Sequence, residues 1–201
     1  MIRNIEKAFS VFRKNYELVP LEVFKNNPYK ILVSTLLSAR TRDETTLAVS
    51  KKLFKKAPNV YKLNSLALEK LTSLTHPVGF YKTKSRHLKK LAKIIIEKYK
   101  GKIPKTHNDL MSLPGVGRKT ANLVLNRAYK KPAIAVDTHV HKISNLLGWV
   151  NTKTPEQTES ALVKILPKKY WKDVNRLLVS VGRQFRTKDK LEAFLRKNKL
   201  I

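Results

Sequence analysis

The sequence contains no cysteine among its 201 residues. Without a thiol, the chain forms no disulfide and has no cysteine nucleophile. It also has no thiolate with which to bind zinc or an iron–sulfur cluster. Cysteine-held metal centres and thiol redox chemistry are therefore excluded, and any covalent catalysis must use another nucleophile.

Acidic residues are also scarce. Asp and Glu total 14 against 43 Lys and Arg, so the formal net charge is +29. A charge this large repels itself in the folded state and indicates a polyanionic partner. Nucleic acid, an anionic membrane surface and an acidic protein are the candidates, and charge alone does not choose among them. Nucleic-acid binding would weaken steeply with salt, because each neutralised phosphate releases counterions.

Long apolar runs are absent as well. No stretch approaches the roughly 18 apolar residues that a membrane-spanning helix needs. The N-terminus, MIRNIEKAFSVFRK, places charges where a signal peptide has its apolar region. We therefore expect an intracellular protein without membrane association.

The pattern of apolar residues predicts an all-α fold. Apolar side chains recur at helical spacing, as at Ile2, Ile5, Phe9 and Phe12, whereas alternating, strand-like runs are short and few. The hydrophobic content of 42% is enough for one compact domain or two small lobes.

Prolines, glycines and capping residues divide the chain into about ten helices. Pro28 begins a helix that runs to Leu37, and Asp43 is expected to cap the next, which ends near Phe54. The other helices are expected at about 65–74, 82–100, 106–112, 118–129 and 137–148, and from about 154, 169 and 188 onward. Among them, Gly101 is expected to close the helix that ends at 100, Thr106 to cap the next one, and Thr154 to begin a capping box with Gln157.

The motif LPGVG, residues 113–117, contains two of the six glycines. Gly115 and Gly117 tolerate positive φ and let the backbone approach a ligand without a Cβ in the way. The N–H groups of such a turn, with the positive end of the following helix, form an anion site suited to phosphate. The alternative is an ordinary connection between two helices.

Lys119 and Asp137 are the candidate catalytic residues. Lys119 follows Arg118 at the start of a helix, where the helix dipole and a neighbouring cation would lower its pKa and favour a nucleophilic amine. Asp137 follows the apolar segment 134–136 and precedes a helix, so its carboxylate would be ionised and fixed. The alternatives are a solvated or phosphate-binding lysine and a simple N-cap.

Asp137, His139 and His141 form a D-x-H-x-H pattern, which offers a second enzyme class, a metal-dependent hydrolase. On a helix, however, His139 points away from the face that Asp137 and His141 share, whereas metal ligands must converge. A third alternative is a non-catalytic DNA-binding module, for which the hairpin and the charge would suffice.

Four blocks in order resemble the endonuclease III branch of the helix-hairpin-helix DNA glycosylase superfamily. They are NPYKILVSTLLSARTRDE, VGFYKTKSRHL, LPGVGRKTANLVLNRAY and AIAVDTHVHKISN, and the similarity extends over roughly residues 1–185. The resemblance implies two helical lobes with a DNA-binding cleft between them. Residues 22–132 would form a six-helix lobe that contains the helix-hairpin-helix, at about 107–129. Residues 1–21 and 133–201 would form the second lobe.

The resemblance implies a bifunctional DNA glycosylase and AP lyase of base excision repair, in which Lys119 aligns with the Schiff-base lysine and Asp137 with the catalytic aspartate. The partner would be double-stranded DNA with a damaged base, an oxidised pyrimidine by resemblance, or an abasic site. We expect a monomer, associated with DNA in the cytoplasm or nucleoid. No metal or redox cofactor is needed for this chemistry.

The resemblance also implies DNA contacts. Arg40 and Phe80 would fill the gap that a flipped base leaves, although core packing would equally explain Phe80. Further DNA contacts are expected from Lys82, Lys84, Leu113, Gly115, Val116, Gly117 and Arg118.

The lesion pocket would be lined by Ser38, Asp43, Met111 and His139. Met111 stands where bacterial relatives have an acidic residue, and a thioether is a poor hydrogen-bond acceptor, so the base preference is expected to shift or broaden. Many relatives hold a [4Fe–4S] cluster with four C-terminal cysteines that are absent here. Arg183, Arg186, Lys188 and Lys190 would supply basic charge instead, on a tail whose Leu191, Phe194 and Leu195 pack inward. The alternative is a solvated helix end.

Overall fold

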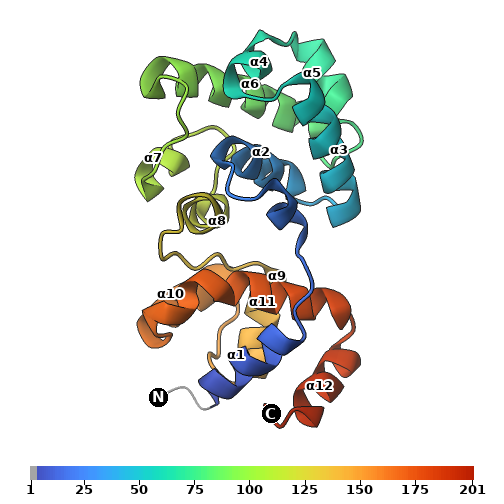
Figure 1. The fold of residues 1–201 in the computed structure, drawn as a ribbon, viewed down its shortest axis with the longest axis vertical. Coiled ribbons are helices and arrows are strands. Elements are labelled where there is room, and N and C mark those ends of the chain that lie inside the picture. The colour runs from blue at the N-terminus through green and yellow to red at the C-terminus, as the bar shows by residue number, and fades with distance from the viewer. Residues whose placement is uncertain (1–3) are drawn as a thin grey trace. The chain divides into compact units, whose positions relative to one another are not determined.

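The computed structural model describes residues 4–201, and every regular element in that range is a helix (Figure 1). This confirms the predicted all-α class. No helix in the described range is long and apolar enough to cross a membrane. The elements are α1 (Ile5–Lys14), η1 (Pro20–Phe24), α2 (Pro28–Ser38), α3 (Asp43–Lys56), α4 (Val60–Ser65), α5 (Leu68–Thr75), α6 (Tyr81–Tyr99), α7 (His107–Met111), α8 (Arg118–Tyr129), α9 (Thr138–Leu146), α10 (Pro155–Ile165), η2 (Lys168–Tyr170), α11 (Trp171–Gln184) and α12 (Lys188–Lys197).

The helices form two compact units. One, here called the middle unit, consists of residues 20–130. The other, here called the terminal unit, combines residues 4–19 with residues 131–201. The first helix of the chain is therefore packed with its C-terminal third. Ile2, which the periodicity assigned to the first helix, lies outside the described residues.

Helix α2 is the centre of the middle unit. Asn27 caps it by accepting a hydrogen bond from the Lys30 N–H at 3.0 Å, and Pro28 occupies its first turn, as the sequence predicts. Residues 31–37 are all buried, and α2 packs against η1, α3, α6 and α8. A helix that is covered on so many sides needs apolar residues all around, which explains the run ILVSTLL.

The segment between α3 and α6 holds two helices where the sequence predicts one. Asn59 begins α4 by accepting a hydrogen bond from the Lys62 N–H at 3.0 Å, and Leu66 and Ala67 are extended before α5 begins. The prediction missed the Asn59 cap. The prediction for Asp43 was also wrong, because Arg42 is the N-cap residue of α3 and Asp43 is its first helical residue.

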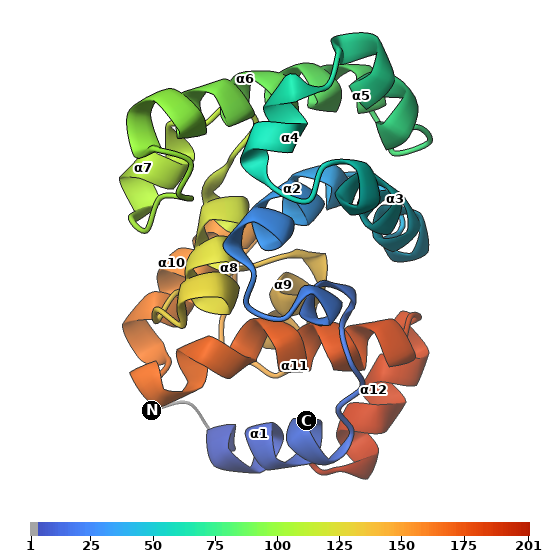
Figure 2. The same cartoon turned by 45° about the horizontal axis from the view of Figure 1, so that its top comes forward.

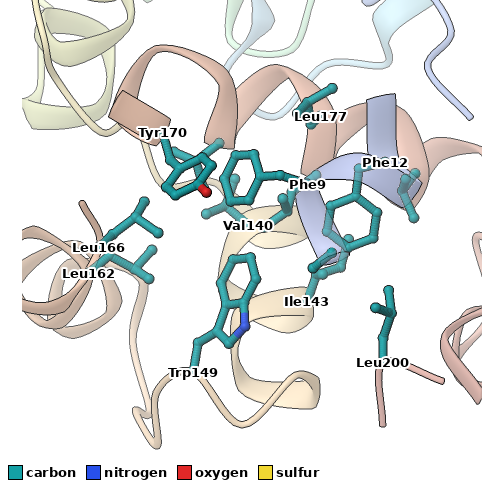
Figure 3. Packing of buried hydrophobic residues seen from close by; sticks show 14 of the residues in the cluster. Phe9, Phe12, Val140, Ile143, Trp149, Leu162, Leu166, Tyr170, Leu177 and Leu200 are labelled. Atoms are coloured by element: carbon teal, nitrogen blue, oxygen red, sulfur yellow. The ribbon is translucent and has the colours of Figure 1, made fainter. Parts of the chain in front are cut away.

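The terminal unit is built around an aromatic cluster, drawn in Figure 3. The Phe9 ring, on α1, stacks on Trp149 at a centroid distance of 5.9 Å and lies 4.2 Å from the Tyr170 centroid. Figure 2 shows α1 lying along α11, which supplies Val174, Leu177, Leu178 and Val181 to the same core.

Helix α12 anchors the C-terminal segment to this core. Thr187 caps it by accepting a hydrogen bond from the Lys190 N–H at 3.3 Å. Leu191, Phe194 and Leu195 are buried, which confirms the predicted inward packing of the tail. The Phe194 ring also stacks on Phe185, at a centroid distance of 4.3 Å.

An ion-pair cluster joins α1 to α11 at the edge of this core. Asp173 Oδ2 accepts a hydrogen bond from Arg13 at 3.0 Å, and Asp173 Oδ1 accepts one from Arg176 at 2.9 Å. Burial alone would raise the pKa of Asp173, but the hydrogen bond from Arg13 and the charge of Arg176 outweigh it and hold the pKa below its ordinary value of 3.8.

We predict that Asp173→Asn destabilises the protein by about 1 kcal/mol at pH 7, since the cluster is only partly buried. A carboxyl whose pKa is lower in the folded state contributes stability above its unfolded pKa and loses that contribution as pH falls through its folded pKa. The stability difference between wild type and variant should therefore shrink below pH 4. Urea unfolding at pH 7 and pH 3 measures it.

Glu97→Gln is the matched control, because Glu97 pairs with Lys93 at 3.8 Å with both side chains well exposed. It should change the unfolding free energy by no more than about 0.5 kcal/mol. If Asp173→Asn lowered the free energy of unfolding by the same amount at both pH values, the lowered pKa of Asp173 would not be the source of its stabilising effect.

Candidate active site

The LPGVG hairpin connects α7 to α8 and is held by its two apolar side chains. Leu113 and Val116 are buried, and the Val116 N–H donates to the Leu113 carbonyl at 3.1 Å, which closes the turn. Gly115 and Gly117 are exposed. The side chains therefore anchor the hairpin, while its backbone is available at the surface.

The two glycines of the hairpin differ in backbone conformation and in surroundings. Gly115 has φ +77°, and a Cβ there would lie 2.6 Å from Nδ1 of His87. Gly117 has φ −95°, and a Cβ there would meet no atom within 4 Å. The fold of the free protein thus explains glycine at 115 but gives no reason for it at 117, where the missing Cβ leaves room for an incoming ligand.

Helix α7 is fixed by a hydrogen-bond cluster around Asp109. Thr106 caps α7 by accepting from the Asp109 N–H at 3.2 Å, as predicted, and its hydroxyl donates to Asp109 Oδ2 at 2.5 Å. The Tyr99 hydroxyl, at the end of α6, donates to Asp109 Oδ1 at 3.0 Å. The Thr106 bond, followed by the Tyr99 bond, holds the pKa of Asp109 below its usual range. These bonds connect α7, and with it the hairpin, to α6.

Lys119 is the second residue of α8, and its side chain is exposed, as is that of Arg118. Gly117 is the N-cap residue and has no side chain to cap the helix. The first N–H groups of an α-helix have no acceptor within the helix and carry its partial positive charge. The start of α8 therefore brings an amine, a guanidinium and backbone donors to one exposed surface of the middle unit.

Asp137 lies in the terminal unit, directly after the buried segment 134–136. Its Oδ1 accepts a hydrogen bond from the Val140 N–H at 2.9 Å, so it is the N-cap of α9. The segment before it is held by Asn175, whose Nδ2 donates to the Ala135 carbonyl at 2.9 Å. The carboxylate is half-buried, and the cap fixes its orientation while Oδ2 stays available for other contacts.

The two histidines near Asp137 have separate surroundings. His141 Nδ1 lies 2.6 Å from the Thr158 hydroxyl, in a polar cluster with Asn145 and Thr152. His139 is half-buried and packs against Gly182, where an added Cβ would lie 2.3 Å from its Nδ1. Within residues 4–201, no group of three or more His, Cys, Asp or Glu side chains is placed to hold a metal ion.

Arg40 and Phe80 lie together in the middle unit, each on a loop. The Arg40 guanidinium carbon is 5.5 Å from the Phe80 ring centroid, and Phe80 is 61% exposed. Core packing, the alternative for Phe80, is therefore wrong. Sequence reasoning missed Thr41 and Gly79, which link the two loops through a 3.0 Å hydrogen bond from the Gly79 N–H to the Thr41 hydroxyl.

The two lysines expected to contact DNA on α6 differ. Lys82 is exposed, but Lys84 is only 6% exposed, and its ammonium bonds to backbone carbonyls of the protein. The expected DNA contact by Lys84 is therefore corrected, because its charge faces inward. Lys84 lies one helical turn before Leu88 on the buried face of α6. Lysine is so seldom buried that spacing alone does not predict an inward-facing charge.

The residues expected in the lesion pocket belong to different elements. Ser38 ends α2, and its hydroxyl donates to the Thr35 carbonyl at 2.8 Å. Asp43 begins α3, and Met111 ends α7 with 41% exposure. His139 belongs to the terminal unit. Ser38, Asp43 and Met111 all lie in the middle unit, at helix ends.

Comparisons with known proteins identify the family to which this chain belongs. Residues 33–168 match the model of the HhH-GPD superfamily base excision DNA repair proteins. Endonuclease III of Thermotoga maritima is 48% identical over 160 residues, which are 80% of this chain and 75% of that protein. Endonuclease III of Bacillus subtilis is 38% identical over 183 residues, 90% of this chain and 84% of that one.

Two solved structures share the fold. A non-covalent endonuclease III–DNA complex superposes with a TM-score of 0.85 at 32% identity, covering 99% of this chain and 97% of that one. A trapped covalent endonuclease III–DNA intermediate gives 0.81 at 32% identity, over 93% and 88%. This chain therefore belongs to the HhH-GPD superfamily of base excision DNA repair proteins, in its endonuclease III branch.

Proposed function

We propose that Lys119 is the nucleophile of this base excision repair enzyme, a bifunctional DNA glycosylase and AP lyase, and that Asp137 is its carboxylate partner. One observation carries the proposal: an exposed lysine in the first turn of α8, directly after the hairpin, in a chain of the endonuclease III branch. A second observation supports it, since Asp137 is held by its own helix cap after a buried segment.

In the first step, the lone pair of the Lys119 amine forms a bond to C1′ of the damaged nucleotide. The bond from C1′ to the base breaks, and the base leaves with that electron pair and gains a proton. Asp137 stabilises the cationic sugar and takes the proton that the attacking amine loses. The C1′–O4′ bond then opens, O4′ takes the proton that Asp137 accepted and becomes a hydroxyl, and a protonated Schiff base remains between Lys119 and C1′ of the sugar.

In the second step, the Schiff base acidifies the C2′ proton. Removal of that proton forms a C2′–C3′ double bond and expels the 3′ phosphate, so that the strand is nicked 3′ to the lesion. Water then hydrolyses the imine and restores Lys119. Both reaction steps require only an amine, a carboxylate and water.

The hairpin would hold the DNA backbone next to this amine. Its exposed turn and the N–H groups at the start of α8 suit one phosphate, and Arg118 adds charge. Because backbone donors recognise a phosphodiester and not a base, this contact would position the enzyme without reading sequence. Leu113 and Val116 support the contact from the buried side.

The exposed pair of Arg40 and Phe80 would occupy the space that the flipped nucleotide leaves. An apolar ring is suited to wedging between bases, and a guanidinium can hydrogen-bond the orphaned base. Lys82, exposed on α6, would add a phosphate contact. The partner is DNA. We propose double-stranded DNA with oxidised pyrimidines or abasic sites as the substrate, bound by a monomer in the cytoplasm or nucleoid.

The residues of this chain do not fit an iron–sulfur cluster, because it has no cysteine. The C-terminal segment is instead anchored by the apolar face of α12, while Arg186, Lys188 and Lys190 are exposed. These three cations are proposed to supply the basic charge toward DNA, together with half-buried Arg183.

We predict that Lys119→Ala abolishes borohydride trapping on DNA with an abasic site, because no imine forms to be reduced. Lys119→Arg keeps the charge but cannot form the imine, so it should bind DNA within about threefold of wild type and also fail to trap. Lys93→Ala, an exposed lysine of α6, is the control and should trap normally. Trapping in EDTA that survives loss of Lys119 would disprove the mechanism.

Gly117→Ala is expected to separate binding from stability. The backbone at 117 accepts alanine, so unfolding should change by less than about 1 kcal/mol. Binding to a duplex with a tetrahydrofuran abasic analogue, measured by anisotropy, should weaken about tenfold or more, because the new Cβ would stand between backbone and phosphate. Unchanged affinity would show that the hairpin does not contact DNA at this position.

Gly115→Ala serves as the comparison. Here the positive φ and the contact with His87 should destabilise the protein itself by about 1–3 kcal/mol. Gly148→Ala controls for the φ effect alone, since Gly148 has φ +65° with no atom within 4 Å of an added Cβ. It should cost about 1 kcal/mol and leave DNA affinity unchanged.

Met111 is expected to affect base preference without affecting the lyase step. Met111→Glu introduces a strong hydrogen-bond acceptor beside the hairpin, so excision of thymine glycol should accelerate, by about tenfold for one charged hydrogen bond. Nicking at a preformed abasic site should not change, since no base is bound. Single-turnover kinetics on both substrates test this, and equal changes on both would place Met111 outside the lesion pocket.

A further inference from the structure

Two loops of the middle unit meet at Arg40 and Phe80: residues 39–42, the α2–α3 loop, and residues 76–80, the α5–α6 loop. Each contains a non-glycine residue with positive φ, 50° at Arg40 and 57° at Phe80. That conformation costs about 1–2 kcal/mol per residue, and it persists only where the surrounding structure holds it. Some part of the protein must therefore hold these two loops.

The Lys84 side chain is the group placed to do so. Its ammonium donates to the carbonyls of Leu37 at 2.7 Å and Ala39 at 2.5 Å, and to the Thr41 hydroxyl at 3.2 Å. Lys84 belongs to the first turn of α6, and its N–H donates to the Phe80 carbonyl at 3.0 Å. Lys84 therefore connects Phe80, the N-cap residue of α6, with the residues before and after Arg40.

Thr41 and Gly79 complete the connection between the loops. The Thr41 hydroxyl accepts hydrogen bonds from the Gly79 N–H and from Lys84, and donates to the Ala39 carbonyl at 3.2 Å. A Cβ on Gly79 would lie 2.5 Å from the Arg40 carbonyl oxygen. The two backbones therefore touch, and any side chain at 79 would separate them.

A positive charge suits this position better than an apolar side chain would. An ammonium has three donors, and here it has three acceptors. Two of these are carbonyls at the C-terminal end of α2, where the helix dipole favours a cation and the carbonyls lack partners within the helix. Burial lowers the pKa of Lys84 to about 8, so at neutral pH most of it is still protonated and donates all three bonds.

We propose that Lys84 is a positioning residue for base flipping, which holds the α2–α3 and α5–α6 loops together so that Arg40 and Phe80 form a preassembled wedge. The proposal rests on the proposed role of Arg40 and Phe80 in DNA. Preassembly matters because ordering two loops during flipping would add their entropy cost to the cost of unstacking a base.

Lys84→Met tests this, since methionine keeps most of the side-chain volume and removes the three donors. Lys89→Met is the matched control. Lys89 is also on α6 and also donates to two backbone carbonyls, those of Asn64 and, at 2.6 Å, Leu66. These carbonyls lie at the C-terminal end of α4 and belong to neither the α2–α3 loop nor the α5–α6 loop. Both variants lose a lysine that binds carbonyls, and only one of them touches the α2–α3 loop.

For Lys84→Met, we expect single-turnover excision of a damaged base to slow by about 10- to 100-fold, the loss typical of misplaced groups. Trapping at a preformed abasic site should fall by about threefold or less, because there is no base to extrude. Lys89→Met should change neither rate. Equal losses in excision and trapping, or no loss in either, would overturn the proposal.

Coupling to Phe80 distinguishes positioning from general support of the fold. If Lys84 acts through the wedge, adding Lys84→Met to Phe80→Ala should slow excision little further, because coupled residues are not additive. Full additivity of the two losses would overturn the proposal. Should Lys84→Met fail to fold, Thr41→Val removes the hydroxyl between the loops, and the same split between excision and trapping is expected.

Insertion of the wedge next to the orphaned base can also be followed without chemistry. In the Lys119→Ala background, 2-aminopurine placed opposite an abasic analogue should brighten on binding, and Lys84→Met should reduce that increase while Lys89→Met does not. This readout is independent of the nucleophile. If Lys119→Ala still nicked DNA, the catalytic assignment would fail and the positioning result would stand by itself, whereas a signal unaffected by Lys84→Met would overturn only the positioning role.

Discussion

The packing of α8 against α2 is the contact on which the rest of the middle unit depends. Residues 121–127 of α8 are buried, so that helix cannot rotate or slide without opening the core. The partly buried ion pair from Arg127 to Glu22, at 2.9 Å, fixes the C-terminal half of α8 to η1. The exposed first turn, with Gly117, Arg118 and Lys119, is thereby presented on a rigid helix and not on a mobile loop.

The same α2 also determines where Arg40 and Phe80, the second set of proposed functional residues, lie. Its C-terminal carbonyls end at the α2–α3 loop, and the charge that satisfies them comes from α6. The hairpin is in turn connected to α6 through Asp109 and through His87, which packs against Gly115. The surface that would grip phosphate and the surface that would wedge into DNA therefore both depend on helices α2 and α6, and a shift in either helix would move both surfaces.

The net charge of +29 limits which interactions can hold the folded protein together. Few carboxylates are available to neutralise it, so cohesion must come from the apolar cores, such as the cluster around Phe9, Trp149 and Tyr170. Helix α12 is likewise held by apolar contacts: buried Leu191, Phe194 and Leu195 anchor a C-terminal segment that has no cysteine with which to bind an iron–sulfur cluster. Basic residues are left for the surface, where a polyanion offsets their repulsion.

The sequence by itself determined the features that depend only on residues close together in the chain. The caps at Thr106 and Thr154 are readable because a cap needs only a short side chain and the next N–H groups. The helix start at Pro28 and the turn at Gly101 are readable because each follows from the conformations that one residue type allows. The all-α class and the inward face of α12 follow from spacing for the same reason. The place of Lys119 at a helix start made it a candidate, but only the ordered match of four sequence blocks separates it from the other lysines.

Only the tertiary structure decided which side chains are buried and which charges are paired, because both depend on which face of an element another element covers. Nothing near Phe80 in the sequence distinguishes an exposed ring from a core ring, and nothing near Lys84 shows that the end of α2 would meet its ammonium. Gly115 needs its glycine because of His87, which comes from another helix, whereas Gly117, with the same local appearance, has open space around it. Local sequence limits which conformations a residue can adopt, but burial and charge pairing are properties of contacts between segments far apart in the chain.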